Sequence, residues 1–90
     1  VSELAKLGSF SLNYNAIGDE GANTLAGSLP ATLTELVLVG CSIGDQGGGA
    51  ILEGAKYANG LHTICIEDNI MSVQMRKQFG SSTGMSVFVW

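Results

Sequence analysis

The sequence predicts an α/β solenoid, in which a unit of strand, turn and helix recurs along the chain and each copy packs on the next. Three observations predict it. A template of spaced apolar residues occurs three times, the motif Ile-Gly-Asp-x-Gly occurs twice at the same place within it, and the 13 glycines are spread along the chain rather than gathered in a linker. Self-similarity of this kind, at a period of roughly 20–50 residues, is typical of repeat proteins.

The template has apolar residues at its first, fourth, sixth and eleventh positions and Asn or Cys at its ninth. The copies are Leu7-x-x-Phe10-x-Leu12-x-x-Asn15-x-Ile17, Leu33-x-x-Leu36-x-Leu38-x-x-Cys41-x-Ile43 and Leu61-x-x-Ile64-x-Ile66-x-x-Asn69-x-Met71, with Met85-x-x-Phe88-x-Trp90 as a fragment of a fourth. We therefore expect one domain over residues 1–90, with repeats at 7–32, 33–60 and 61–84 and a terminal strand at 85–90. Because an open stack exposes core at its ends, we also expect a piece of a longer protein.

The first part of each unit is predicted to be a short strand. Apolar residues at template positions four and six alternate with other residues, which indicates a strand with one face buried. Positions three, five and seven then point to the opposite face. In the tail, the same template turns Phe88 and Trp90 inward and Val87 and Val89 outward.

The second part of each unit is predicted to be a helix. Asp19 and Asp45 stand where the first two helices would start, and a carboxylate there can accept hydrogen bonds from free backbone N–H groups. Apolar or small residues follow at helical spacing: Ala22, Leu25, Ala26 and Leu29 in one unit, Ile51, Leu52 and Ala55 in the next. Gly21 and Gly47 cost about 1 kcal/mol each in a helix. We interpret their presence as a sign that the neighbouring repeat unit, or coil, approaches the helix closely at these positions. The third helix lacks the motif and should be shorter, with Ser72 as its cap.

These features resemble leucine-rich repeats of the ribonuclease-inhibitor type, which also occur in NOD-like receptors and Ran GTPase-activating protein. The resemblance extends from Leu7 to Trp90. It implies a short curved solenoid, with parallel strands on a concave face and helices on a convex face. It also implies that the residue at position nine bonds loop backbone between coils, which here means Asn15, Cys41 and Asn69.

By the same resemblance, the protein is a noncatalytic scaffold for protein–protein interaction through its concave strand face. The candidate binding residues are Ser9, Ser11, Asn13, Glu35, Val37, Val39, Thr63, Cys65 and Glu67, to which the tail would add Val87 and Val89. Tyr14 is a further candidate aromatic. The simpler interpretation of the valines on this face is that valine favours strands, without a role in binding. The alternative function is a spacer, or a self-associating module acting through strand 85–90, in a larger receptor, effector or regulator that binds its ligand elsewhere.

Composition argues against several other partners. The formal net charge is −4 and there is no Lys/Arg cluster, so we expect neither nucleic acid nor an anionic membrane as a partner. No apolar run reaches the length of a membrane span, and the N-terminal residues lack the pattern of a signal peptide. We expect a cytoplasmic protein.

No residue pattern predicts an enzyme, a cofactor or a metal site. His62 and Cys65 point to opposite faces of a strand and lack zinc-ligand spacing. The run Gly47-Gly48-Gly49 lacks the Gly-Lys-Ser/Thr ending of a phosphate loop, which leaves packing between coils as its role. GTPase activation is the weakest interpretation, because the single arginine, Arg76, is predicted to lie in the third helix. Cys41 and Cys65 are offset along neighbouring strands by about 13 Å, too far for a disulfide, so we expect two thiols.

Overall fold

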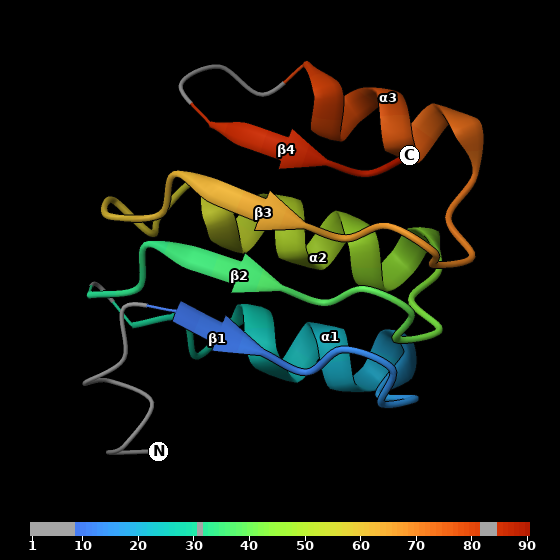
Figure 1. The fold of residues 1–90 in the computed structure, drawn as a ribbon, viewed down its shortest axis with the longest axis horizontal. Coiled ribbons are helices and arrows are strands. Elements are labelled where there is room, and N and C mark those ends of the chain that lie inside the picture. Colours follow the sequence, from blue (N-terminus) through green and yellow to red (C-terminus); the bar gives the residue numbers. More distant parts are fainter. Residues whose placement is uncertain (1–8, 31, 82–84) are drawn as a thin grey trace.

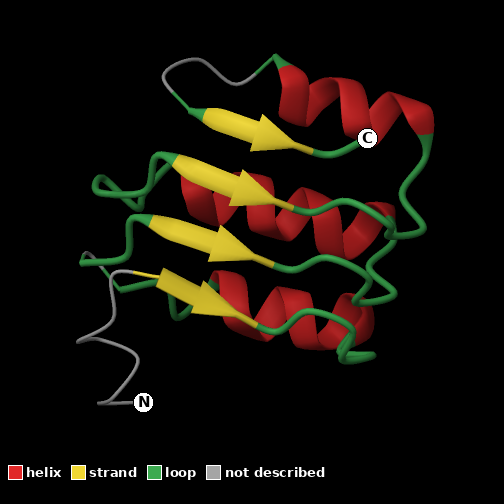
Figure 2. Cartoon of the chain, in the orientation of Figure 1, coloured by secondary structure: helices red, strands yellow, loops and turns green. Residues whose placement is uncertain are grey.

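Strands and helices alternate along the whole part of the chain that the computed structural model describes, namely residues 9–30, 32–81 and 85–90. Figures 1 and 2 show the strands as one layer and the helices as another. The elements are β1 (Ser9–Ser11), α1 (Gly18–Ala26), β2 (Glu35–Val37), α2 (Asp45–Ala55), β3 (Thr63–Cys65), α3 (Val73–Gly80) and β4 (Ser86–Phe88). This order confirms the predicted α/β repeat. The first template position, Leu7, lies outside the described residues.

The four strands form one parallel sheet in the order β1-β2-β3-β4. Phe10, Leu36 and Ile64, all at template position four, pair across the first three strands. A parallel connection requires a crossover, and each helix provides one. The sheet therefore places equal template positions side by side.

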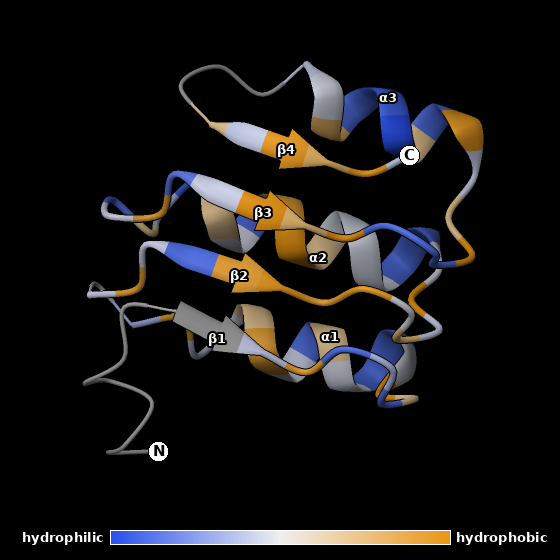
Figure 3. Ribbon diagram, in the orientation of Figure 1, coloured by the Kyte–Doolittle hydropathy of each residue, from blue (hydrophilic) through white to orange (hydrophobic). Residues whose placement is uncertain are grey.

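The core lies between the sheet and the helices and is built from the apolar template positions. In the second coil these side chains are fully buried: Leu33, Leu36, Leu38, Cys41 and Ile43. Ile64, Ile66, Ile51 and Phe79 join them from the third coil and the helices. Figure 3 shows apolar residues running through the second half of β2, β3 and β4. Each fully buried leucine or isoleucine contributes about 1.5–3 kcal/mol, so the template is also the main source of stability.

The predicted register of the last strand is wrong by one residue. Ile64 pairs with Val87 and Cys65 with Phe88, so Val87 and Val89 take the inward positions. Val89 is only 2% exposed, whereas Phe88 is 53% and Trp90 66% exposed. A shift of one residue exchanges the faces of a strand. The observed register buries Val89 and packs Met85 and Val87 against the core, where they are partly buried. It keeps the Ser86 hydroxyl and the indole N–H, which would need partners if buried, at the surface.

The prediction that Asp19 and Asp45 cap their own helices is also wrong. Neither α1 nor α2 has a side-chain cap of its own. Instead, Oδ1 of Asp19 accepts hydrogen bonds from the backbone N–H groups of Gly44 (2.6 Å) and Gly47 (2.9 Å), at the start of α2. In the same way, Oδ1 of Asp45 accepts one from Ser72 N (2.6 Å), at the start of α3. Each carboxylate therefore caps the helix of the next coil and joins neighbouring coils.

The third helix follows the prediction more closely. The Ser72 hydroxyl accepts a hydrogen bond from Met75 N at 3.2 Å, which confirms Ser72 as the cap. With eight residues, α3 is shorter than α1 and α2, which have nine and 11. The hydrogen bond from the Ser72 backbone lowers the pKa of Asp45. The carboxylate that joins α2 to α3 is therefore ionised at neutral pH.

The helix glycines mark places where a side chain does not fit. A Cβ on Gly47 would lie 2.6 Å from Asp19 Oδ1 and 2.9 Å from Asp19 Cα, which confirms close approach of the neighbouring coil. A Cβ on Gly54 would lie 2.7 Å from Ala26 O of α1. For Gly21 the interpretation is wrong, because its Cβ would meet Ile17 Cβ of the same coil at 2.8 Å. The glycines of α2 thus serve helix packing.

The residue at template position nine joins the loops of successive coils. Asn69 is buried; its Oδ1 accepts from Cys41 N (2.8 Å) and Ile43 N (3.0 Å), and its Nδ2 donates to Leu38 O (2.9 Å). The thiol of Cys41 donates to Leu12 O of the first coil at 3.0 Å. This confirms the loop-bonding role for the second and third coils. Asn15 is exposed and donates to carbonyls of its own coil.

Candidate protein-binding face

The candidate site is the side of the sheet that faces away from the helices, which we call the strand face. It consists of the side chains at template positions three, five and seven. Those described are Ser11, Asn13, Glu35, Val37, Val39, Thr63, Cys65, Glu67, Ser86, Phe88 and Trp90. The predicted residue Ser9 belongs to β1, but its side chain lies outside the described part.

Strand pairing assembles the predicted residues into rows across the sheet. At position five, Ser11 pairs with Val37, Val37 with Cys65 and Cys65 with Phe88. At position three, Glu35 lies beside Thr63. The central row is therefore apolar on three neighbouring strands and ends in an exposed phenylalanine in place of the predicted Val89.

Sequence reasoning missed the two aromatic residues of the strand face. Phe88 and Trp90 were assigned to the core because the template was continued without a shift. The signal that could have placed them is the alternation within residues 85–90, where Met85, Val87 and Val89 form one apolar face and the polar Ser86 belongs to the other. A polar residue on one face of an otherwise apolar strand marks the surface side.

Backbone hydrogen bonds extend the register to position seven. Gly40 N donates to Glu67 O at 3.0 Å, and Ile66 N donates to Phe88 O at 2.8 Å. The first bond places Glu67 beside Val39 of the second coil, and the second continues the pairing of β3 with β4 as far as Phe88. Oδ1 of Asn13 accepts a hydrogen bond from Val39 N at 2.9 Å, so this predicted binding residue also joins the first two coils.

The carboxylates of Glu67 and Glu35 act on the Cys65 thiol near the centre of the strand face. Burial, followed by the charges of Glu67 and Glu35, raises the pKa of the Cys65 thiol. Among the described residues of the strand face there is no lysine or arginine. Cys65 therefore stays a neutral thiol at physiological pH. The structure contains Cys41 and Cys65 as free cysteines, as predicted.

Arg76 holds the end of the strand face in place. Its Nη2 donates to Asn69 O at 2.8 Å and its Nε to Met71 O at 3.2 Å. Its guanidinium carbon lies 5.8 Å from the centre of the Trp90 ring, within the range of a cation–π interaction. Arg76 thus connects α3 to the preceding loop and orients the indole, which is a structural role.

Tyr14 lies at the end of the first strand and is 74% exposed. Its φ is +60°, and the residues at the same template position, Gly40 and Asp68, also have positive φ. A Cβ on Gly40 would lie 2.6 Å from Tyr14 Cδ1, so the ring packs directly on the backbone of the next coil. Tyr14 therefore presents a supported aromatic surface beside the strand face.

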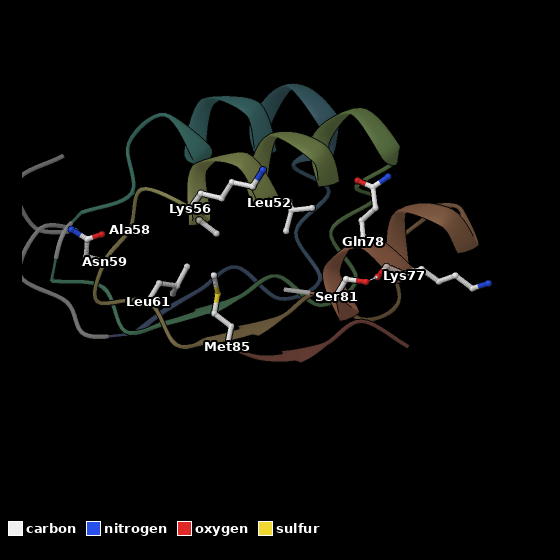
Figure 4. A pocket seen from close by; sticks show the side chains of 10 residues that line it. Leu52, Lys56, Ala58, Asn59, Leu61, Lys77, Gln78, Ser81 and Met85 are labelled. Atoms are coloured by element: carbon white, nitrogen blue, oxygen red, sulfur yellow. Dashed lines mark hydrogen bonds between the residues drawn. The ribbon is translucent and has the colours of Figure 1, made fainter. Parts of the chain in front are cut away.

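A cavity of about 750 Å³ lies between the C-terminal parts of α2 and α3, and Figure 4 shows its walls. Leu52, Leu61 and Met85 are among the apolar side chains that line it. Lys56 at its rim already contacts Glu53 at 3.2 Å, and the side chain of Lys77 extends away from it in Figure 4. The charged groups of this cavity do not converge on one point.

The described residues include no group of three or more His, Cys, Asp or Glu side chains able to hold a metal ion. His62 is exposed, with its Nδ1 2.9 Å from Thr63 Oγ1. The longest described helix has 11 residues, and no helix in this part of the chain is long and apolar enough to cross a membrane.

Comparison with protein families gives a match on the first two coils. The family described as "Leucine Rich repeat" matches residues 4–26 and 30–52, together just over half of the chain. The chain belongs to the leucine-rich repeat family. Such repeats are commonly protein-interaction modules and are generally noncatalytic, so the match is consistent with a scaffold role. The matched segments each contain one Ile-Gly-Asp-x-Gly motif. None of the curated proteins compared with this leucine-rich repeat chain matches it.

Proposed function

We propose that this leucine-rich repeat chain is a noncatalytic scaffold that binds a protein partner through the strand face, with the strand face as the concave side of a short curved solenoid. The observation that carries the proposal is the exposure of Phe88, which lies in one row with Val37 and Cys65, together with the exposure of Trp90 two residues further along the chain. Aromatic residues are enriched in protein interfaces. The two Ile-Gly-Asp-x-Gly motifs support the ribonuclease-inhibitor-like subtype.

The strand face is preorganised for binding. Its backbone is held by parallel pairing on four strands, and Arg76 restrains the indole of Trp90. An interface built on a rigid element loses less conformational entropy on association than one built on a loop. The acidic charge of the chain and the lack of a Lys/Arg cluster favour a protein partner over nucleic acid or an anionic membrane.

The proposal can be tested by selecting binders of the wild-type chain from a displayed protein library. The binders are then measured against the double variant Val37→Arg, Cys65→Arg, whose positions lie side by side on the strand face. We expect affinity to fall at least tenfold, about 1.4 kcal/mol, for most independent binders. Asn23→Arg, on the exposed side of α1, is the matched control. Unchanged affinity of a folded double variant would refute the proposal.

A second candidate is self-association through residues 85–90. β4 is one of the two edge strands of the described sheet, and residues 85–90 carry no charged side chain. An uncovered apolar edge strand can pair with another chain. Sedimentation or light scattering over a range of concentrations tests this candidate, because a species that remains monomeric at every concentration excludes it.

A further inference from the structure

The carboxylates of the strand face bracket its apolar centre diagonally. Glu35 lies at position three on β2 and Glu67 at position seven beyond β3. Val37 and Cys65, both at position five, lie between them on the same two strands. With neighbouring strands about 4.8 Å apart and a rise of about 3.3 Å per residue, the backbone positions of the two glutamates are about 14 Å apart.

Both carboxylates act on the space over this centre. The charges of Glu67 and Glu35 reach Cys65 from its two sides and disfavour its anionic form. The same potential favours any cation placed there, and it weakens with added salt because these groups are accessible to water. A partner that covers the centre with an apolar side chain therefore gains from a positive charge on either side of it.

We propose that the partner of the strand face is a basic segment of a protein, in which two Lys or Arg side chains flank an apolar one. The apolar side chain covers Val37 and Cys65, and the cations approach Glu35 and Glu67. In an extended segment a separation of about 14 Å corresponds to about four residues, and residues i, i+2 and i+4 share one face. The matching pattern is therefore cation-x-apolar-x-cation. This inference rests on the proposed function and specifies the chemistry of its ligand.

The test uses three capped heptapeptides: Gly-Lys-Ser-Leu-Ser-Lys-Gly and its analogues with both lysines replaced by Gln or by Glu. Each is titrated into the 15N-labelled 90-residue chain at low and high salt. We expect the lysine peptide to shift the amide signals of Val37, Cys65 and Glu67, and to bind at least fivefold more tightly than the Gln peptide. Binding should weaken with salt, and the Glu peptide should not bind.

Charge variants of the chain supply the matched control. An exposed ion pair contributes about 0.2–1 kcal/mol, so Glu35→Gln and Glu67→Gln should each weaken the lysine peptide by roughly 1.5–5-fold. Glu53→Gln removes the same charge from α2, outside the strand face, and should change nothing. Shifts spread over α1 and α2, or an equal effect of Glu53→Gln, would overturn the inference.

The remaining outcomes separate this inference from the proposed function. If the lysine and Gln peptides bind equally well, the inference of a basic partner is overturned. If the Val37→Arg, Cys65→Arg variant also weakens the binding of both peptides, the strand face remains the binding site. Binding by none of the peptides also overturns the inference. The proposed function then still depends on the library selection, which places no demand on the charge of the binder.

Discussion

Replacement of Asp19 by alanine is expected to destabilise the junction between the first two coils. Its Oδ1 accepts hydrogen bonds from Gly44 N and Gly47 N at 2.6 and 2.9 Å. Both glycines are buried, so water does not readily replace the lost acceptor. A hydrogen bond to a charged group contributes about 1.5–3 kcal/mol, and each unsatisfied buried donor costs about 1–3 kcal/mol. Because the two bonds share one oxygen, we expect a total loss of about 2–4 kcal/mol.

Urea unfolding followed by circular dichroism measures this loss. With a slope of about 1.5 kcal/mol per M, a change of 3 kcal/mol lowers the midpoint by roughly 2 M. Asp19→Asn keeps the acceptor oxygen and should lose about half as much. Glu20→Ala, at the neighbouring exposed position of α1, is the control for loss of charge. If Asp19→Ala unfolds at the same urea concentration as Glu20→Ala, the inter-coil cap does not stabilise the protein.

Two further predictions concern a glycine and a thiol. Gly47→Ala should lower the free energy of unfolding by about 1–3 kcal/mol despite the higher helix propensity of alanine, because its Cβ would overlap the preceding coil. Gly80→Ala, where nothing lies within 4 Å of the added Cβ, is the matched control. Equal effects of the two substitutions in urea unfolding would contradict the packing argument. The pKa of Cys65 is raised by burial, Glu67 and Glu35, so the pH profile of its alkylation should lie above that of the unfolded chain and move down in Glu67→Gln. Because the folded-state pKa of Cys65 is raised, the free energy of unfolding should fall as pH rises from the unfolded-state pKa through the folded-state pKa. An alkylation profile identical to that of the unfolded chain would refute the raised pKa of Cys65.

The apolar template carries most of the fold because it repeats. Leu36 and Ile64 recur at the same position of each unit, and a parallel strand with one buried face follows from that spacing alone. The same spacing located the predicted residues of the strand face from Val37 to Glu67. These features depend on local periodicity, which a single sequence contains.

The last strand was assigned the wrong face because its sequence satisfies both registers. Phe88 and Trp90 on one side and Val87 and Val89 on the other are all apolar, so among residues 85–90 only the polar Ser86 distinguishes the two registers. Pairing with β3 decides between them, since a residue beside Ile64 must share its face. The aromatic end of the candidate site therefore depends on a contact between coils that the template does not encode.

The sequence by itself determined the α/β repeat, the approximate helix positions and the core side chains of the first three units, because these follow from periods of two and 3.6 residues within each unit. Only the tertiary structure decided how one unit meets the next. Asp19 and Asp45 cap the helix of the following coil rather than their own, and β4 aligns with β3 so that Phe88 and Trp90 face outward. Partners across coils are separated by more than 20 residues, so their geometry is set by stacking and not by local pattern.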